Sequence, residues 1–559
     1  MKKEIYDKST HINKANQVKY GFIIDNRKCI GCHACTVACK SEHNVPIGVT
    51  RTFVKQVEKG EFPNSKRLFS VMRCNHCSDA PCMSICPTDA LYKRKDGIID
   101  FDNRRCIGCK SCMQACPYDA LYIDPETHTS AKCNYCAHRV DVGLKPACVI
   151  ICPEQAIISG NMKDPKSEIS QLLSKHDVKV RKKEKNTQPN LFYINAEDVS
   201  LVPSKTSRSS RYIWNSQTTG VGHFAKFADS LTKDKSLTDL QNQLDPKLLS
   251  ANEITDKQTN KESEKRLIDK VKRVFDFPDK GILWGREVSG YVWTKAISTG
   301  TFLVAFFSAF LPSFNEKYDV FLIGIITGLI FLAFTGVLLI KDLDQPKRFL
   351  YVLLRPRWES WLVKGGYAIT FFGILLSVSC LMFYLELSTT LFKAAMCSAA
   401  LLAVITSIYT AFLFRQAKGR DLWQSPILLF HMLTHSIMAG GSVFSLISCI
   451  PNCEFSDGFL DYINTILIYS LIINLLLLII EFKLLKHTED SKETLKMISI
   501  GRYKNSFWIG VITLGNTIPL CLAFSGNHHL LSTAGLLVIV GIYIAEHIWI
   551  EAPQRISLT

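Results

Sequence analysis

The chain has 559 residues, more than a single hydrophobic core accommodates, so two or three domains are expected. Its formal net charge of +16 at pH 7 could indicate a nucleic-acid partner. The Lys and Arg residues instead flank apolar runs or lie in a polar stretch, so we expect no nucleic-acid binding. Sixteen of the 21 cysteines lie between Cys29 and Cys152, a crowding that indicates disulfides or metal.

The N-terminal segment MKKEIYDKSTHINKANQVKYGF has no apolar signal-peptide core and no twin arginine. We therefore expect that the protein is not exported. Because disulfides are rare in proteins that are not exported, the cysteines are predicted to bind metal.

The crowded cysteines form four groups of four. They are Cys29, Cys32, Cys35 and Cys39; Cys74, Cys77, Cys82 and Cys86; Cys106, Cys109, Cys112 and Cys116; and Cys133, Cys136, Cys148 and Cys152. The first and third groups have the C-x2-C-x2-C-x3-C spacing of a bacterial ferredoxin. In that spacing three thiolates bind one [4Fe–4S] cubane and the fourth binds the cubane of a partner motif. The second and fourth groups widen one gap, which a bulging loop can absorb.

The cysteine-rich region also repeats. CPTDALY at 86–92 recurs as CPYDALY at 116–122 and more loosely as CPEQAII at 152–158, which indicates duplication of a small metal-binding unit. Zinc would use isolated groups of four ligands, so it is disfavoured. CIGCH at 29–33 matches a c-type haem attachment site, but it lies inside a complete cluster motif. His33 and His76 are accordingly expected near clusters and not as ligands.

Several clusters in series indicate electron transfer. No acid–base pair or nucleophile motif accompanies the cysteines, so we expect a non-catalytic redox subunit whose substrate chemistry belongs to another polypeptide.

After this region the composition changes twice. Residues 204–274 are polar and are predicted to form a flexible linker. Eight apolar runs of about twenty residues follow, each long enough to cross a bilayer. They lie at about 291–312, 320–340, 362–385, 391–414, 425–449, 461–482, 506–525 and 530–550.

The stretches RCNHCSDAPCMSICPTDALYKRKDGIIDFDNRRCIGCKSCMQACPYDALYIDP and AKCNYCAHRVDVGLKPACVIICP resemble the iron–sulfur subunit of DMSO-reductase-type molybdoenzymes. With the extension KNTQPNLFYINAEDVSLVP, the region looks most like the subunit of cytoplasm-facing sulfite dehydrogenases. The resemblance implies nested ligand sets. These are Cys29, Cys32, Cys35 and Cys152; Cys133, Cys136, Cys148 and Cys39; Cys74, Cys77, Cys82 and Cys116; and Cys106, Cys109, Cys112 and Cys86. Because Cys109 is present, it implies four [4Fe–4S] clusters.

The second half resembles the polysulfide-reductase type of membrane anchor, which binds quinone and carries no haem. The matching stretches are KGILWGREVSGYVWTKAISTG, KDLDQPKRFLYVLLRPRWESWLVKGGY and FLFRQAKGRDLWQSP. In such relatives the two halves are usually separate chains, whereas here the linker joins them.

Ionisable groups in or beside apolar spans are costly and often functional. Lys295, Asp342 and Arg348 are therefore the candidate quinone-binding residues, although arginines at span ends also serve as interfacial anchors. His431 and His435 lie one turn apart on one face. One such pair cannot supply both axial ligands of a b-type haem, so packing or proton handling is expected, and these histidines are the next quinone candidates.

Together these observations predict an α+β tandem ferredoxin-like domain (residues 18–203), a linker (204–274) and an all-α eight-helix membrane bundle (275–559). The expected function is electron relay between a molybdopterin catalytic subunit and membrane quinone, with sulfite oxidation as the leading reaction. The same role in a DMSO, polysulfide or tetrathionate reductase is the alternative, and an anchor for hydrogenase or formate dehydrogenase is another.

Two other classes of function fit the sequence less well. A redox-driven proton pump would need acidic residues through the spans, and Glu386, Glu481 and Glu546 are not mid-span. A purely structural anchor does not account for sixteen potential ligands.

The orientation in the membrane follows from the positive charges. Nineteen Lys and Arg residues lie near span ends on the iron–sulfur side, against Lys317 and Lys393 on the other. The positive-inside rule therefore predicts an inner-membrane protein whose iron–sulfur domain faces the cytoplasm.

Overall fold

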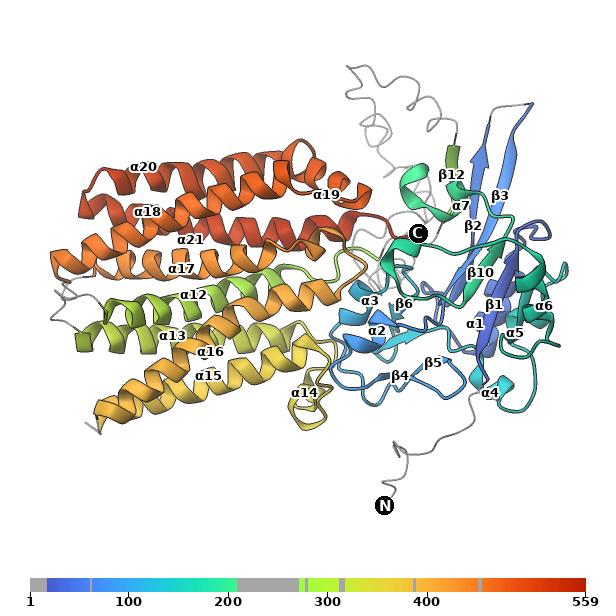
Figure 1. Cartoon of the computed structure of the whole chain (residues 1–559), viewed down its shortest axis with the longest axis horizontal. Coiled ribbons are helices and arrows are strands. Elements are labelled where there is room, and N and C mark those ends of the chain that lie inside the picture. The colour runs from blue at the N-terminus through green and yellow to red at the C-terminus, as the bar shows by residue number, and fades with distance from the viewer. Residues whose placement is uncertain are drawn as a thin grey trace, which may run out of the picture.

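The computed structural model describes residues 18–60, 63–208, 271–276, 280–310, 317–385, 389–450 and 455–559. Most of the segment expected to be a linker, residues 209–270, lies outside the described residues, as does Glu386. An α+β domain and a bundle of long helices lie end to end along the long axis of the molecule (Figure 1).

One four-stranded sheet holds the two ends of the α+β domain together. Its order is β8-β1-β10-β9, and β1 pairs parallel with β10 and antiparallel with β8. The strands are β1 (Tyr20–Asp25), β8 (Ile157–Asn161), β9 (Val178–Lys179) and β10 (Leu191–Ile194). Strand β1, YGFIID, is buried over five consecutive residues, so both of its faces are covered by protein. Helix α6 (Glu168–Lys175) packs beside β8.

A second sheet has the order β11-β12-β2-β3. Its strands are β2 (Thr52–Lys59), β3 (Lys66–Arg73), β11 (Ser207–Arg208) and β12 (Val271–Phe275). Strand β12 pairs antiparallel with β2, with Val271 opposite Lys59. Val271 and Arg273 are buried, and Arg273 pairs with Asp276 at 2.7 Å. Residues 271–274, which were expected to belong to the linker, are therefore part of the sheet.

Short helices and the loops beside them carry the cysteines, and two hairpins complete the domain. The helices are α1 (Ala34–Glu42), α2 (Pro81–Ser84), α3 (Ser111–Ala115), α4 (Ala137–Val140), α5 (Ala147–Ile150) and α7 (Asp198–Leu201). The hairpins pair β4 (Leu91–Lys93) with β5 (Ile99–Phe101), and β6 (Leu121–Ile123) with β7 (Ser130–Lys132).

The repeat seen in the sequence recurs in the backbone. Asp89, Asp119 and Gln155 stand at the same place after the Cys-Pro of each repeat, and all three have φ between 50° and 55°. Gly31 and Gly108 likewise occupy equivalent Cys-Ile-Gly-Cys turns with φ of 72° and 70°. Because glycine adopts this left-handed conformation without steric cost, the turns can wrap tightly around their cavities.

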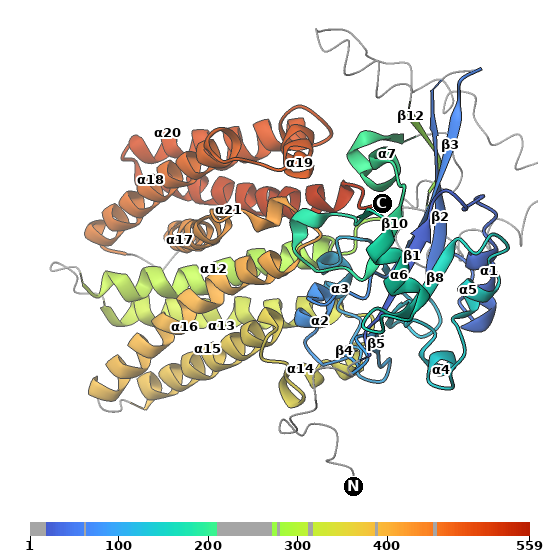
Figure 2. The same ribbon diagram turned by 45° about the vertical axis from the view of Figure 1, so that its right-hand side comes forward.

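The second half is a helical bundle. Its long helices are α12 (Arg286–Ser308), α13 (Lys317–Lys341), α15 (Trp361–Tyr384), α16 (Thr389–Gln416), α17 (Leu428–Ile447), α18 (Asp457–Ile479) and α21 (His528–Glu551). The π-helix η7 (Ser506–Thr517) continues into α20 (Ile518–Phe524), and a second π-helical turn, η6 (Ile480–Leu484), continues α18. Shorter helices α14 (Tyr351–Leu354) and α19 (Glu489–Ser499) lie at the end next to the α+β domain (Figures 1 and 2).

Seven helices among the described residues are long and apolar enough to cross a membrane. The expected span that is not among these seven, 291–312, corresponds to α12, which packs against α13, α16, α17 and α21 and runs through the middle of the bundle (Figure 1). Most of its side chains are buried, so its Ser, Thr and Lys residues face protein. The predicted fold class is confirmed.

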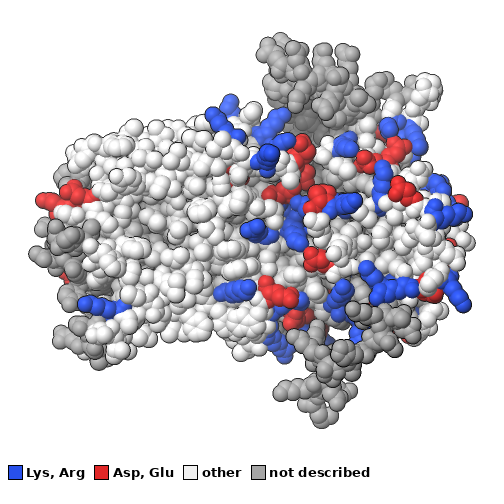
Figure 3. Space-filling view, viewed as in Figure 1, with Lys and Arg blue, Asp and Glu red and all other residues white. Residues whose placement is uncertain are grey.

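The α+β domain docks on one end of the bundle, and one cluster of buried side chains crosses the junction. The backbone N–H groups of Asp344 and Gln345 donate to the carbonyls of Gly108 (3.4 Å) and Ile107 (3.2 Å). A Cβ on Gly108 would lie 2.6 Å from the Cβ of Asp344, so only glycine permits this approach. In Figure 3 the charged side chains gather over the junction and the α+β domain, whereas most of the bundle surface in view is uncharged.

Candidate cluster sites and membrane pocket

One cavity of the α+β domain is lined by Cys29, Cys32, Cys35 and Cys152. Cys32 is exposed, whereas Cys35 is buried. The backbone N–H of Ala156 donates to the Cys152 sulfur at 3.2 Å. The first three cysteines of one motif therefore meet the last cysteine of another at a cavity near the surface.

A similar cavity faces the bundle and is lined by Cys86, Cys106, Cys109 and Cys112. The backbone N–H groups of Gly108 and Ser130 donate to the Cys106 sulfur at 3.4 and 3.3 Å. Again three cysteines of one motif meet the last cysteine of another.

The remaining eight cysteines lie between these cavities. Arg73 donates to the sulfurs of Cys133 (3.5 Å) and Cys148 (3.2 Å), and Cys39 interacts electrostatically with the same two residues. His43 Nε2 lies 3.2 Å from the Cys136 sulfur. A separate neighbourhood contains Cys82, which interacts with Cys74, Cys77 and Cys116. The assignment of individual cysteines to clusters stays a prediction.

The donor set fits iron–sulfur clusters. Among the described residues, no three Cys, His, Asp or Glu side chains converge as the ligands of a single ion do. The thiols instead surround cavities, and backbone amides and the buried Arg73 guanidinium point at the sulfurs. Such donors stabilise thiolate-bound clusters and influence their reduction potential. A [4Fe–4S] cubane in such a cavity would be held by four thiolates, and it would accept or give up one electron at a time.

The two histidines expected near clusters have different surroundings. His33 packs edge-on against Phe275 of β12, with ring centroids 4.6 Å apart. His76 is buried and accepts the backbone N–H of Ile99 at 3.2 Å. Burial and the nearby Lys132 and Arg73 hold the pKa of His76 far below its usual range, so the ring is neutral.

The structure separates the three sequence-predicted quinone residues. Arg348 donates to the carbonyls of Asn103 (2.7 Å) and Cys106 (3.0 Å), so it joins the α+β domain to the bundle. Asp342 also lies at the junction, where Lys110 donates to its backbone carbonyl at 3.0 Å. Burial, opposed by Lys110, raises the pKa of the Asp342 carboxyl to about 7. Lys295 lies inside the bundle and donates to Thr410 Oγ1 and, at 3.0 Å, to the carbonyl of Ser407.

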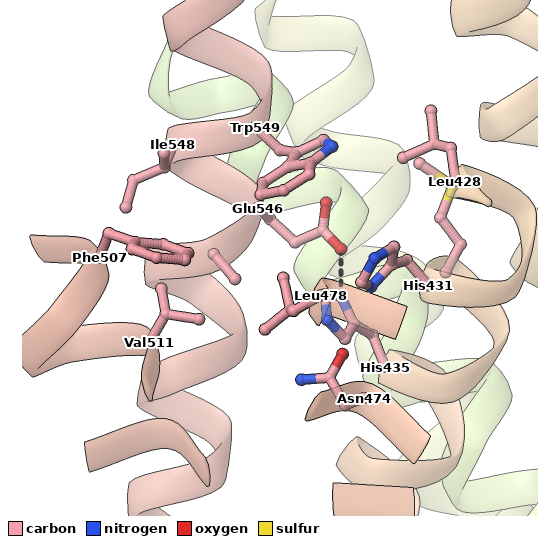
Figure 4. A pocket seen from close by; sticks show the side chains of 12 residues that line it. Leu428, His431, His435, Asn474, Leu478, Phe507, Val511, Glu546, Ile548 and Trp549 are labelled. Carbon is pink, nitrogen blue, oxygen red and sulfur yellow. Dashed lines mark hydrogen bonds and ion pairs between the residues drawn. The ribbon is translucent and has the colours of Figure 1, made fainter. Parts of the chain in front are cut away.

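A cavity in the membrane half (Figure 4) is lined mostly by side chains of the buried cluster that crosses the junction. Its walls come from α17, α18, η7 and α21. The polar lining consists of His431, His435, Asn474, Glu546 and Trp549, and the remaining lining is apolar. The Glu546 carboxylate points toward the two histidines and pairs with His435, whose Nδ1 is 2.7 Å from Glu546 Oε1 (Figure 4).

Aromatic side chains connect the cluster cavity nearest the bundle with this pocket. Trp284 Nε1 donates to the carbonyl of Cys109 at 3.1 Å, and its ring stacks on Trp423 with centroids 5.5 Å apart. Trp423 Nε1 donates to the carbonyl of Trp549 at 2.9 Å, and the Trp549 ring lies 5.8 Å from the His431 ring. One series of direct contacts therefore runs from a cysteine loop to the pocket wall.

Sequence reasoning identified His431 and His435 but missed Asn474, Trp549, Trp284 and the role of Glu546. Glu546 is an ionisable group in an apolar span, so the rule that selected Lys295 could have found it, and extending the rule to neutral polar side chains could have found Asn474. The tryptophans carry no such signal, because apolar aromatic residues are ordinary members of membrane helices and their ends.

Residues 66–162 match a family described as "4Fe-4S dicluster domain", and residues 276–556 match "Polysulphide reductase, NrfD". A tetrathionate reductase subunit of Salmonella typhimurium is 44% identical over 190 residues, which cover 33% of this chain and 76% of that protein. A polysulfide reductase chain of Wolinella succinogenes is 41% identical over 179 residues, covering 32% of this chain and 94% of that protein.

The arsenate respiratory reductase iron-sulfur subunit ArrB of a Shewanella species is 34% identical over 225 residues, which cover 32% of this chain and 96% of that subunit. These matches confirm the resemblance to the iron–sulfur subunits of DMSO-reductase-type enzymes and to the polysulfide-reductase type of membrane anchor. The chain is an iron–sulfur electron-transfer subunit fused to a multi-pass membrane anchor, and it belongs to the polysulphide reductase NrfD family.

Proposed function

We propose that this chain relays electrons through four [4Fe–4S] clusters between a molybdopterin catalytic subunit and membrane quinone. The observation that carries the proposal is the series of contacts from Cys109 through Trp284 and Trp423 to Trp549. It joins a cavity lined by four cysteines to a pocket inside the membrane bundle.

The pocket suits a quinone head group. Apolar and aromatic walls accommodate the ring, and the His435–Glu546 pair offers groups that accept or donate protons at the ring oxygens. Lys295 on α12 interacts electrostatically with Glu546. It therefore influences the charge of the pocket through that carboxyl group. Asp342 and Arg348 lie at the junction, where they hold the α+β domain in place.

The catalytic partner is proposed to dock at the opposite end, beside exposed Cys32. Ile30, Val37, Ile47 and Ile150 expose between 55% and 89% of their surface in or near the segments that line this cavity. Exposed apolar side chains gathered in this way mark interaction surfaces. Sulfite oxidation remains our leading reaction. The names of two relatives, a tetrathionate and a polysulfide reductase, support the alternative of reducing a sulfur compound.

Cluster content is the first test. Four cubanes require about sixteen irons and sixteen sulfides per chain after anaerobic purification. Cys109→Ser should remove about one quarter of the iron and leave the protein in the membrane, because the other cavities keep their cysteines. Cys397→Ser, at an exposed cysteine of the bundle, is the control. Iron and sulfide assays decide, and a preparation dominated by zinc contradicts the proposal.

Quinone exchange is the second test. Glu546→Gln and His435→Asn should slow quinol-driven cluster reduction by about 100-fold or more, because each removes a proton-transferring group. Reduction by dithionite should be unchanged, since it bypasses the pocket. Stopped-flow absorbance follows both reactions, and Glu359→Gln at the exposed junction surface is the control.

Lys295→Ala and Asp342→Ala test the residues chosen from the sequence. Lys295→Ala should give a smaller defect than Glu546→Gln, since Lys295 acts on the pocket only through Glu546. If Lys295→Ala and Asp342→Ala abolish exchange and the pocket variants do not, the quinone site lies between α12 and the junction.

Partner docking is the third test. Val37→Asp combined with Ile150→Asp should abolish copurification of a molybdenum-containing polypeptide, because two charges would be buried unpaired in the interface. Iron content should stay normal, and Val18→Asp, elsewhere on the domain, should have no effect. Native preparations without molybdenum, or retention of the partner by the double variant, would reject this docking surface.

Orientation is the fourth test. Positive side chains are concentrated at the iron–sulfur end of the bundle, as the part of the surface seen in Figure 3 also indicates. We propose that this end faces the cytoplasm. Protease should then cleave within residues 204–270 in inverted vesicles and not in intact spheroplasts. The reverse pattern would place the clusters outside.

A further inference from the structure

A buried carboxyl group that the proposed quinone site does not use lies just beyond the pocket. Glu481 belongs to η6, the π-helical turn that follows α18, and only 1% of its surface is exposed. No salt bridge joins it to a Lys or Arg among the residues that the structure describes. A buried, unpaired carboxyl group costs stability, so its retention points to a role.

Two chain segments place Glu481 one layer from the pocket. On α18, Asn474 and Leu478 line the pocket, and Glu481 follows three residues after Leu478. Residues three or four apart are neighbours on a helix surface. On the facing segment, Leu428 and His431 line the pocket, and Ser425 precedes Leu428 by three residues. Ser425 and Glu481 therefore meet behind the layer formed by Leu428 and Leu478.

The hydrogen bonds of Glu481 leave half of its carboxyl group available. Ser425 Oγ donates to Glu481 Oε2 at 2.5 Å, whereas Oε1 is buried and has no hydrogen-bond partner among the described residues. A carboxyl group with one free buried oxygen can take up a proton there while Ser425 holds the other oxygen.

A less buried histidine lies next to Glu481 and interacts electrostatically with it. His487 Nε2 lies 2.6 Å from the backbone carbonyl oxygen of Glu481, and its Nδ1 lies 3.1 Å from Ser491 Oγ. The His487 ring is only partly buried and lies beyond the end of η6, next to α19. Glu481 thus stands between the pocket and a titratable group at the surface on the iron–sulfur side.

We propose that Glu481 carries protons between the quinone pocket and the aqueous phase on the iron–sulfur side. The inference rests on the proposed function, because it assumes that quinone binds in the pocket. When a quinol is oxidised, it gives one electron to each of two oxidised clusters in turn and loses two protons. The His435–Glu546 pair accepts each proton in turn at the ring oxygens. The first proton passes from there to the Glu481 carboxylate and on to water beside His487, and the second follows the same route once Glu481 is free again; quinone reduction reverses each step.

The experiment uses the full-length protein with its clusters and menadiol as the electron donor. Glu481→Gln keeps the size of the side chain and a hydrogen bond with Ser425 but cannot carry the proton. It should slow the reduction of the clusters by menadiol, followed as the loss of their visible absorbance (bleaching), at least tenfold. It should also increase the solvent deuterium isotope effect on that reduction, because proton transfer then limits its rate. Glu481→Asp should recover part of the rate. Added azide, a small proton carrier, should accelerate the Gln variant and leave the native protein unaffected.

Two control variants distinguish proton transfer by Glu481 from a purely structural or surface-charge effect. Glu489→Gln removes an exposed carboxylate from α19 at the same end of the bundle and should be silent. Ser425→Ala keeps the carboxyl group but removes its hydrogen bond; it should react faster than Glu481→Gln, whereas a purely structural Ser425–Glu481 contact predicts equal defects.

The outcomes distinguish the two proposals. The affinity for menadiol, measured by the quenching of tryptophan fluorescence, should be unchanged in Glu481→Gln. Normal bleaching rates and isotope effects in Glu481→Gln would overturn the proton-carrying role while the pocket stands. If native protein is not reduced by menadiol, or if Glu546→Gln and His435→Asn leave exchange intact, the proposed function fails first.

Discussion

The contact between the turn around Gly108 and the loop around Asp344 fixes the geometry on which electron transfer depends. Two backbone hydrogen bonds join these segments, and the glycine has no side chain to keep them apart. Because Gly108 lies between Cys106 and Cys109, the same turn that shapes a cluster cavity also seats the domain on the membrane bundle. Because protein interiors are close-packed, this contact holds the cluster cavity at a fixed position relative to the bundle. Trp284 can then reach the Cys109 carbonyl from the start of the bundle.

The interior of the bundle accommodates polar groups because α12 is surrounded by other helices. Thr299 donates to the carbonyl of Lys295 in its own helix, and a Cβ on Gly300 would lie 1.7 Å from the Ser436 carbonyl oxygen of α17. Small residues at such crossings let helix backbones approach closely in membranes. Helix α12, at the centre of the bundle, is consequently less apolar than its neighbours. Only its composition distinguishes it from the seven helices that are long and apolar enough to cross a membrane.

Local patterns in the sequence were enough to predict the cysteine motifs, the apolar spans and the repeat that the backbone later showed at Asp89 and Asp119. These features depend on short spacings or on runs of one residue type. The pocket could not be predicted in the same way, because His435 and Glu546 are 111 residues apart and meet only through helix packing. Arg348 illustrates the opposite difficulty. Its position beside a span indicated function, whereas its partners are backbone carbonyls of the other domain.

Strand β12 has a consequence for the fusion of the two halves. It pairs with the edge of β2 opposite to β3, along residues 56–59, and Phe275 at its end packs on His33. A sheet edge left open is a template for pairing with another chain. Because the segment that leads into the bundle occupies this edge, each α+β domain shields itself from strand exchange with its neighbours in a crowded membrane. The covalent connection thus contributes selectivity of assembly as well as a fixed one-to-one ratio of iron–sulfur domain to membrane anchor.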